Sequence, residues 1–281
     1  MRLAKVLGAL GRSCITLGTL LLLFVVYQLW GTGIREAQAQ NRLDADFGEL
    51  LDEQNTPTTT PDPQTVPSIP PAAEGEATAI IEIPRIGLER VVVEGVAVAD
   101  LKKGPGHYPE TPLPGQEGNA AIAGHRTTYG APFNRINELE KGDEILVQTL
   151  QGKFRYLVTE QLIVSPSQVE VLEDKGDNRL TLTACHPKYS ARERIVVVGE
   201  LSGPALPARP TGRVTFEDIS GGGGLITTIL FGLLCASIWL FAWALGRVWR
   251  KWPAYVLGLP FFLVGLFYFF EEFSQVLPSN Y

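Results

Sequence analysis

Cysteine and histidine are scarce in this sequence, with three residues of each among 281. Cys14 and Cys235 lie inside long apolar segments, where a thiol acts as a small hydrophobic group. Only Cys185 lies in a polar region, so no disulfide is expected within that region, and its thiol is a candidate nucleophile. No second cysteine and histidine cluster completes a zinc site with Cys185-His186, so we expect neither a metal nor another cofactor.

An excess of positive charge is also missing. The formal net charge is -6, and no basic patch of the nucleic-acid-binding kind stands out against it. Nucleic-acid binding depends on such patches, because the phosphate backbone supplies much of the attraction. The composition therefore predicts no nucleic-acid partner.

Long apolar runs are present, and the first covers residues 14–30. This run is almost uncharged and about as long as a bilayer core requires. Basic residues precede it within residues 1–13 and acidic residues follow it, which predicts an N-terminus inside the cell and the following chain outside. A signal peptide with a peptidase site at Ala37-Gln-Ala39 is the alternative. The run is longer than a usual signal core, which favours an uncleaved anchor.

Two further apolar runs cover residues 225–246 and 253–270. Both are apolar on every face, which is typical of membrane spans and not of core helices. The turn between them, residues 247–252, is basic and aromatic and is expected in the cytoplasm, whereas the acidic tail, residues 271–281, is expected outside. We therefore predict a multi-pass protein of the cell membrane whose large central region lies on the extracytoplasmic face.

Two linkers flank that central region. Residues 31–76 are rich in proline and threonine, and the part from Gln40 to Glu76 has few apolar side chains to bury. This composition predicts an extended, partly disordered spacer. Residues 203–224, rich in proline and glycine, form the second linker. The domain is expected between the two, at residues 77–202.

The pattern in residues 77–202 is that of a mainly β domain. Short apolar runs alternate with turn signals, Gln151-Gly152 is typical of a hairpin, and only short helices are expected, one of them around Phe133–Leu139. Many strands without a long helix predict a closed or nearly closed β-barrel. The strands are expected near Thr78–Ile83, Arg90–Val96, Asn119–Ala123, Glu144–Leu150, Lys153–Ile163, Leu180–Ala184 and Arg194–Leu201.

Three side chains at strand ends form a candidate catalytic site. Cys185 ends an alternating run, Arg194 begins the next β-branched run, and His125 follows another apolar run. A thiolate can attack a carbonyl, an imidazolium can protonate a leaving amine, and a guanidinium can stabilise the oxyanion. Arg192 lies two positions before Arg194 and shares its strand face, so the pattern alone does not choose between the two arginines.

Each of these residues also has a purely structural interpretation. Cys185 fits a small buried residue at the end of a strand, His125 fits a loop histidine, and Arg194 fits a surface arginine on an edge strand. His107, within Gly-Pro-Gly-His-Tyr-Pro, is expected to lie in a turn. On these interpretations the domain is a non-enzymatic, membrane-held β-domain for binding or assembly.

The motifs taken together resemble those of the sortase family. Thr181-Leu-Thr-Ala-Cys185, followed by Arg194 before an apolar strand, resembles the sortase pattern Thr-Leu-x-Thr-Cys, a loop, then Arg. Ala-Gly-His125 resembles the histidine segment of sortases, and Gly104-Pro-Gly-His-Tyr-Pro109 resembles the stretch before it. The continuation Cys-His-Pro-Lys-Tyr-Ser-Ala is most similar to class E sortases of high-GC Gram-positive bacteria.

The resemblance implies an eight-stranded sortase-type β-barrel, mainly β with short helices, and a membrane-tethered cysteine transpeptidase. Its partners would be secreted proteins with a C-terminal sorting signal of the Leu-Pro-x-Thr-Gly or Leu-Ala-x-Thr-Gly type. The signal would be cut between Thr and Gly through a thioacyl intermediate, and the Thr would be joined to a peptidoglycan precursor amine of the lipid II type. Cys185 would be the nucleophile, His125 the acid/base and Arg194 the oxyanion arginine. Thr183, Ala184 and His186 would contact substrate.

Two departures from the family pattern matter. The threonine before the cysteine is Ala184 here, which affects substrate contacts but not the nucleophile. Apolar C-terminal segments are more typical of class C enzymes, which join a sorting signal to a pilin lysine. Those enzymes usually carry an Asp-Pro-aromatic lid, whereas the spacer here offers only Asp62-Pro-Gln64, so an open pocket is expected. An L,D-transpeptidase is disfavoured because its Ser-x-Gly-Cys motif is missing.

Overall fold

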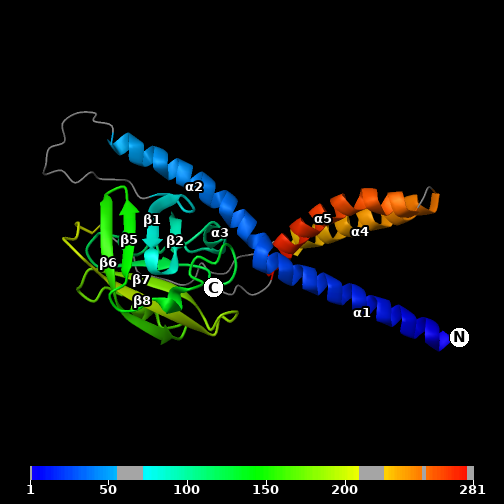
Figure 1. Ribbon diagram of the computed structural model, residues 1–281, viewed down its shortest axis with the longest axis horizontal. Helices are drawn as coiled ribbons and strands as arrows, with labels where there is room; N and C mark the ends of the chain where they lie inside the picture. The colour runs from blue at the N-terminus through cyan, green and yellow to red at the C-terminus, as the bar shows by residue number, and fades with distance from the viewer. Residues whose placement is uncertain (1, 56–71, 209–224, 249–250, 277–281) are drawn as a thin grey trace. The chain divides into compact units, whose positions relative to one another are not determined.

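The computed structural model describes residues 2–55, 72–208, 225–248 and 251–276 (Figure 1). These residues fall into two compact units. Of the described residues, the first unit contains those up to residue 29 and those from residue 225 onward, and the second contains residues 30–55 and 72–208. The second unit holds the strands and is described first.

Eight strands form a closed barrel in the order β1-β2-β3-β4-β7-β8-β6-β5. This confirms the predicted fold class. The hairpin predicted at Gln151-Gly152 is also confirmed, since Thr149 pairs with Gly152 across β5 and β6. The strands are β1 (Ala77–Ile83), β2 (Leu88–Glu94), β3 (Gly106–His107), β4 (Asn119–Ala123), β5 (Glu144–Thr149), β6 (Gly152–Val164), β7 (Arg179–His186) and β8 (Glu193–Leu201).

Short helical pieces connect the strands. They are α3 (Val98–Leu101) and the 3-10 turns η2 (Pro84–Ile86), η3 (Ile136–Glu138) and η4 (Val169–Val171). η3 lies within the range where a short helix was predicted. Strand β3 has only two residues, and it pairs in parallel with β2 and antiparallel with β4. Its brevity explains why no apolar run predicted it.

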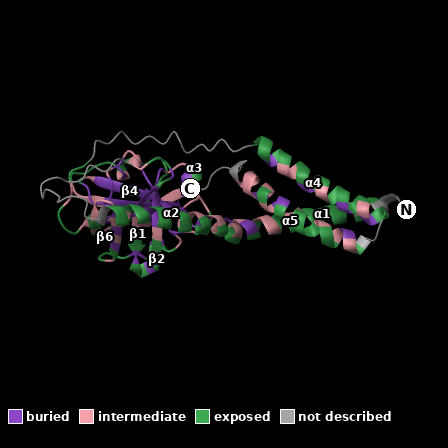
Figure 2. Cartoon of the chain, turned by 90° about the horizontal axis from the view of Figure 1, so that it is seen from above, coloured by how far each residue is buried: buried purple, intermediate pink, exposed green. Residues whose placement is uncertain are grey.

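The barrel core is filled by alternate residues of the strands. Leu180, Leu182 and Ala184 of β7 belong to the core cluster together with Ile195 and Val197 of β8. Successive strand residues point to opposite faces, so Thr183 and Cys185 point out of the barrel. Figure 2 shows buried residues gathered on the strands, β4 among them. The outer face of β4 is itself covered, in part by Leu101, Tyr108 and Leu172, which pack with Ala121 and Ala123.

One helix corrects the predicted spacer. Residues Thr32–Asn55 form α2, although the part from Gln40 onward was predicted to be extended. Leu43 and Phe47 are buried against Ala77, Val91 and Val93 of the barrel, and Leu51 packs beside them. The spacing of four residues between Leu43, Phe47 and Leu51 gives one apolar helical stripe, which an average composition hides. Residues 56–71 of the predicted spacer lie outside the described residues.

The predicted linker after the barrel also begins later than expected. Leu206 forms a bridge with Gln116, and backbone hydrogen bonds of 2.8 Å join Leu206 to Gly115 and to Glu117. These contacts make residues 203–208 part of the domain. Residues 209–224 lie outside the described residues.

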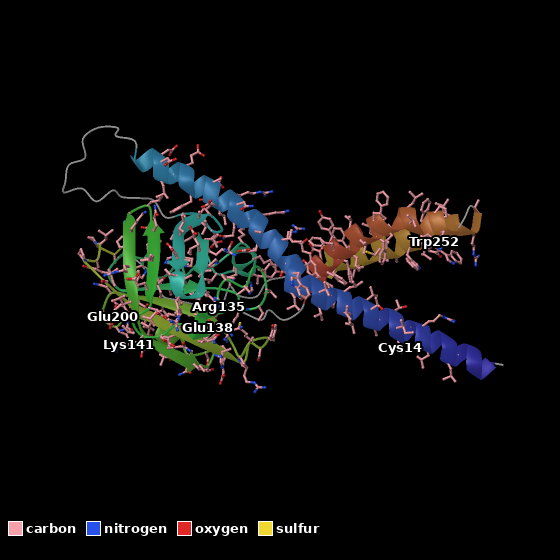
Figure 3. The ribbon with its side chains drawn as sticks, in the orientation of Figure 1. Cys14, Arg135, Glu138, Lys141, Glu200 and Trp252 are labelled. Atoms are coloured by element: carbon pink, nitrogen blue, oxygen red, sulfur yellow. The ribbon has the colours of Figure 1, made fainter. Side chains whose placement is uncertain are left out.

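The first unit contains long apolar helices: α1 (Arg2–Val26), α4 (Leu225–Val248) and α5 (Lys251–Val276). A π-helical turn, η1 (Tyr27–Gly31), follows α1. Three helices of the described chain are long and apolar enough to cross a membrane. The first, Val6–Glu53, runs through α1, η1 and α2, and the other two are Leu225–Val248 and Trp252–Ser274. Helix α5 continues past the predicted boundary at residue 270 and includes the start of the predicted tail. Cys14 is exposed on α1 (Figure 3).

Candidate active site

Strands β7 and β8 bring two of the three candidate residues together. The strands are antiparallel, and Cys185 is the register partner of Arg194. Residues directly opposite each other in an antiparallel pair project on the same face of the sheet. Arg194 donates from Nη1 to the carbonyl oxygens of Ala191 at 3.3 Å and Glu193 at 3.2 Å. These bonds hold its guanidinium beside the loop that joins the two strands.

Strand β4 brings His125 to the same end of the barrel. Strands β4 and β7 are parallel, with Ala123 paired to Thr183, and the amide of Gly124 donates to the Thr183 carbonyl oxygen at 3.0 Å. Two residues further along the chain stand His125, just after the end of β4, and Cys185, which still belongs to β7. The His125 carbonyl oxygen accepts a bond of 3.0 Å from the amide of Phe133, and the side chain is 4% exposed.

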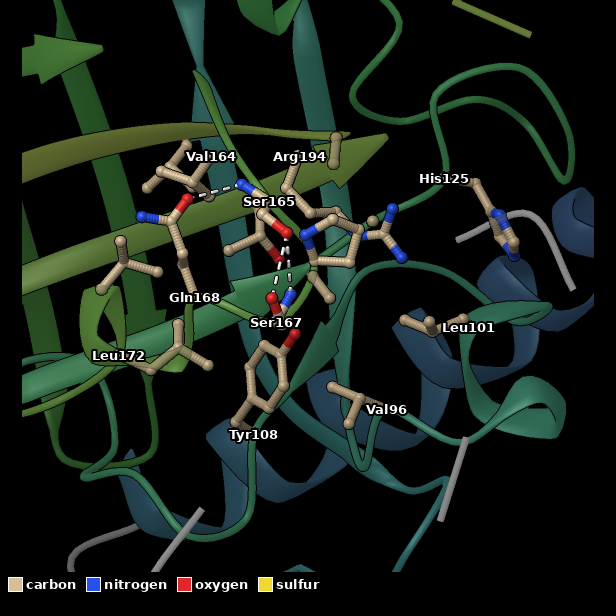
Figure 4. Close-up of a pocket in the computed structure, with 17 residues that line it drawn as sticks. Val96, Leu101, Tyr108, His125, Val164, Ser165, Ser167, Gln168, Leu172 and Arg194 are labelled. Carbon is tan, nitrogen blue, oxygen red and sulfur yellow. Dashed lines mark hydrogen bonds between the residues drawn. The ribbon is translucent and has the colours of Figure 1, made fainter. Parts of the chain in front are cut away.

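A pocket of about 270 Å³ opens on the outer face of these strands (Figure 4). His125, Thr183, Ala184 and Arg194 line it, so four of the six predicted site residues share one cavity. Arg192 lies in the loop before β8 and is not among the lining residues. The remaining walls are mostly apolar, with Val96, Leu101, Tyr108, Ala123, Val164, Val171, Leu172 and Val196, and one wall is the Ser165–Gln168 loop.

Burial dominates the protonation of the candidate nucleophile. Loss of hydration raises the pKa of the Cys185 thiol, and the positive charges of Arg194 and then Arg126 act in the opposite direction. A positive charge beside a thiol favours its thiolate form. Arg194 does favour the thiolate, but the burial of a thiol that is only 6% exposed has the larger effect. The resting thiol is therefore neutral.

The imidazole of His125 is neutral as well. Burial, and then the charge of Lys102, lowers the pKa of His125 to about 4. A neutral imidazole can accept a proton from a neutral thiol, which creates a thiolate and an imidazolium together. The pair is thus suited to proton transfer during the reaction and not to a permanently charged resting state.

Arg126 is a second guanidinium at the site that the sequence did not reveal. It is 6% exposed, and its Nη1 donates to the Cys185 carbonyl oxygen at 3.0 Å and to His186 Nδ1 at 3.1 Å. Its Nη2 donates to Asn137 Oδ1 at 2.8 Å. These contacts place His186 against Arg126, and His186 does not line the pocket. The only signal in the sequence was the position of Arg126 directly after His125.

Tyr108 is another residue that the sequence did not reveal. Its hydroxyl is hydrogen-bonded to the Thr183 side chain, and the charges of Arg194 and then Glu110 act on it. Burial raises its pKa, so it stays neutral and can serve as a hydrogen-bonding group. Figure 4 shows its ring at the pocket.

The prediction that His107 lies in a turn is wrong. His107 belongs to β3, is fully buried, and its Nδ1 is 2.9 Å from Glu94 Oε2. Its Nε2 is 2.9 Å from the Pro112 carbonyl oxygen, so both ring nitrogens face acceptors. This network ties β3 to β2 and fixes the backbone next to Tyr108.

A tyrosine covers the candidate acid/base. The ring centroids of Tyr129 and His125 are 5.1 Å apart with an interplanar angle of 37°. Lys102 Nζ lies 5.7 Å from the Tyr129 ring centroid, within the range of a cation–π contact. Within the described residues, no group of three or more His, Cys, Asp or Glu side chains is placed to hold a metal ion.

Comparison with known proteins identifies the family. A family model described as the sortase domain matches residues 81–202. Sortase SrtE1 of Streptomyces coelicolor is 37% identical over 209 residues, which are 69% of this chain and 56% of SrtE1. Sortase SrtE2 of the same organism is 30% identical over 214 residues, which are 70% of this chain and 83% of SrtE2.

A solved structure of a Clostridium perfringens sortase D5 transpeptidase matches with a TM-score of 0.50 and 28% identity, and the match covers 59% of this chain and 99% of that one. The chain spans little more than half of SrtE1 and most of SrtE2. The family model, the relatives and the closed barrel all indicate the same family. The chain belongs to the sortase family, whose members are cysteine transpeptidases, and it is similar to the class E sortases of Streptomyces.

Proposed function

We propose that this chain is a membrane-anchored sortase that cleaves a Leu-Pro-x-Thr-Gly or Leu-Ala-x-Thr-Gly signal between Thr and Gly and joins the Thr to a peptidoglycan precursor amine. One observation carries the proposal. Cys185 and Arg194 are register partners on β7 and β8, and β4 brings His125 to the same edge, beside a pocket that His125 and Arg194 both line. This arrangement supports Cys185 as nucleophile, His125 as acid/base and Arg194 as oxyanion stabiliser.

The first half of the proposed reaction forms a thioester. His125 accepts the thiol proton of Cys185, and the sulfur attacks the carbonyl carbon of the Thr residue of the signal. Arg194 stabilises the oxyanion, because a guanidinium offers several N–H donors and a positive charge to the developing negative oxygen. The imidazolium of His125 then gives its proton to the departing amine of Gly. The Thr–Gly amide bond breaks, and a sulfur–carbon bond replaces it.

The second half consumes the thioester. The acceptor amine attacks the same carbonyl carbon, and His125 takes a proton from the attacking nitrogen. When the tetrahedral intermediate collapses, the sulfur leaves and recovers a proton from His125. The products are a new amide bond and a neutral thiol, so the enzyme returns to the resting state that burial favours.

The pocket supports a signal peptide as the substrate. Its mostly apolar walls suit the leucine side chain of the signal, and its polar groups, the hydroxyl of Tyr108 and the guanidinium of Arg194, suit backbone carbonyls. Thr183 and Ala184 lie on the pocket wall and are proposed to contact the peptide. We assign His186 no direct contact, because it is hydrogen-bonded to Arg126.

The location of the protein is part of the proposal. The three apolar helices support anchoring in the cell membrane. The distribution of basic and acidic residues supports an N-terminus in the cytoplasm and the barrel on the extracytoplasmic face. Secreted proteins that carry a sorting signal would meet the enzyme on that face.

The C-terminal helices support a second candidate acceptor. Helices α4 and α5 give the chain apolar C-terminal segments of the kind that is more typical of class C sortases. In that case the acceptor would be a pilin lysine. The chemistry at Cys185 would be the same, and only the attacking amine would differ.

One experiment tests both activity and acceptor. The full chain, purified in detergent, is mixed with peptides carrying either signal, and mass spectrometry follows Cys185. We expect an acyl adduct that Cys185→Ala removes and that Cys14→Ser and Cys235→Ser retain. Adding a diaminopimelate-type amine and a pilin lysine peptide together identifies the acceptor by the product mass. If folded protein gave no adduct with any signal peptide, the non-enzymatic interpretation would replace this proposal.

A further inference from the structure

Helix α2 has two kinds of contact with the barrel. Its C-terminal half packs through Leu43 and Phe47. Further toward its N-terminus, Gln40 bonds the backbone on both sides, since Oε1 accepts from the Val91 amide at 2.8 Å and Nε2 donates to the carbonyl oxygens of Val91 and Lys103 at 2.9 Å. These contacts fix the position of the helix on the strands.

The first turn of α2 contacts the loop that follows His125. Thr32 is fully buried, and its Oγ1 accepts a hydrogen bond of 3.1 Å from the Tyr129 amide. Glu36 is 2% exposed and accepts a bond of 2.8 Å from Arg90 Nε. The Glu36 carboxylate also fills the space beside Gly130, where a β carbon would collide with it. The N-terminal half of α2 therefore contacts the barrel unit through polar side chains, in addition to the apolar packing of its C-terminal half.

The loop that α2 contacts has a strained backbone. Tyr129 has a φ of 48° and Ala131 a φ of 45°, and non-glycine residues rarely adopt such values. Conformations of this kind persist only where the surroundings impose them. The bond to Thr32 and the packing of Glu36 provide such surroundings. In this loop conformation the Tyr129 ring contacts the His125 imidazole, with 5.1 Å between the ring centroids.

We propose that α2 is a positioning element of the active site, in which Thr32 and Glu36 hold the loop of residues 128–131 so that Tyr129 covers His125. The inference rests on the proposed function, because it assigns α2 a part in the acid/base step. Neither Thr32 nor Glu36 lines the pocket. They act through Tyr129, which orients the imidazole and keeps water away from it.

Charged groups around His125 come from several elements. Lys102, after α3, acts directly on the imidazole, and Cys185 and Arg194 belong to β7 and β8. Arg126 is the next residue of the chain, and Glu36 of α2 is paired with Arg90 of β2. Since burial is the larger cause of the low His125 pKa, a loop that opens should hydrate the ring and raise that pKa toward its ordinary 6.5.

The test uses the full chain with Thr32→Val, which keeps the shape of the side chain and removes the acceptor. The matched control is Thr159→Val, which removes a bond of 3.2 Å from Thr159 Oγ1 to the Val198 carbonyl oxygen in the barrel. Tyr129→Leu removes the covering ring itself. For each variant we would measure the melting temperature, the pH dependence of kcat/KM with a signal peptide, and the NMR titration of isotope-labelled histidine. The His125 signal is assigned as the one that is missing in the His125→Gln variant.

We expect Thr32→Val and Tyr129→Leu to raise the pKa of His125 from about 4 and to shift the acidic limb of the kcat/KM profile with it. We also expect kcat to fall by about fivefold or more, which is the size of effect that the loss of one buried hydrogen bond implies. Thr159→Val should change only the melting temperature. If Thr32→Val and Tyr129→Leu both left the His125 titration unchanged, the proposal would be wrong. The NMR titration decides this even if no peptide is a substrate, so failure of the proposed function is recognised separately.

Discussion

Arg126 donates a hydrogen bond of 3.0 Å from Nη1 to the backbone carbonyl oxygen of Cys185. The residue next to the candidate acid/base thereby holds the backbone of the candidate nucleophile. The same guanidinium reaches His186 and Asn137, so it ties the end of β7 to the loop after β4. Its charge also favours the thiolate form of Cys185.

The first prediction concerns the hydrogen bonds of Arg126. Arg126→Met should slow acyl adduct formation by about ten- to a hundredfold, because it leaves a buried carbonyl without its donor and removes a positive charge near the thiol. Arg126→Lys should recover only part of the rate, since one ammonium cannot replace a planar fork that bonds three groups. Single-turnover mass spectrometry measures the rate.

Arg135→Met is the matched control for Arg126. Arg135 pairs with Glu138 at 2.7 Å on the surface, where both side chains are about half exposed (Figure 3). Exposed pairs of this kind contribute little to stability. Equal loss of activity in the Arg126 and Arg135 variants would contradict a specific role for Arg126.

The second prediction concerns the reactivity of Cys185 in the free enzyme. Because burial raises its pKa above the ordinary value of 9.0, its alkylation by iodoacetamide should be slow at neutral pH and still increase above pH 9.0. Arg194→Met should move the midpoint to still higher pH, since Arg194 lowers this pKa. The measurement uses a Cys14→Ser, Cys235→Ser background. Fast alkylation at pH 7 would show instead that the resting site holds a thiolate and imidazolium pair.

The third prediction concerns stability and pH. His125 has a pKa of about 4 in the folded protein and an ordinary pKa of 6.5 when unfolded. The unfolded state therefore binds the proton more readily, and this contribution to stability is present above pH 6.5 and is lost as the pH falls toward 4. The difference amounts to about 3 kcal/mol. His125→Gln should flatten the fall in melting temperature between pH 6.5 and 4, and an unchanged pH profile would argue against a buried neutral imidazole.

The fourth prediction compares two glycines. Gly130 and Gly142 both have positive φ angles, 71° and 95°, so alanine is strained at either position. Only at Gly130 would the new β carbon meet the Glu36 carboxylate, whereas at Gly142 nothing lies within 4 Å. Gly130→Ala should displace the loop of residues 128–131 and lower kcat/KM by about tenfold or more. Gly142→Ala should cost about 1 kcal/mol of stability and leave activity unchanged. Equal activity of the two variants would speak against the role of α2.

Local patterns in the sequence determined most of the barrel. The seven predicted strands match β1, β2 and β4 to β8 because each has a run of apolar residues long enough to show a period. The neighbouring positions of Cys185 and Arg194 were also predictable, since a single short loop separates their strands. The three apolar segments were visible for the same reason: length and composition are properties of one segment.

Tertiary structure alone decided which side chains surround the site. Strand β3, the pairing of Arg126 with the Cys185 carbonyl, and the cover of Tyr129 over His125 are contacts between segments that no local period relates. Likewise, the register of β7 and β8 determines that Arg194, and not Arg192, lines the pocket. Even α2, with its visible stripe of Leu43 and Phe47, gained its proposed role from where its first turn meets the loop at Gly130. A sequence determines such contacts only through the whole fold, because burial and register are properties of the packed chain and not of any one stretch.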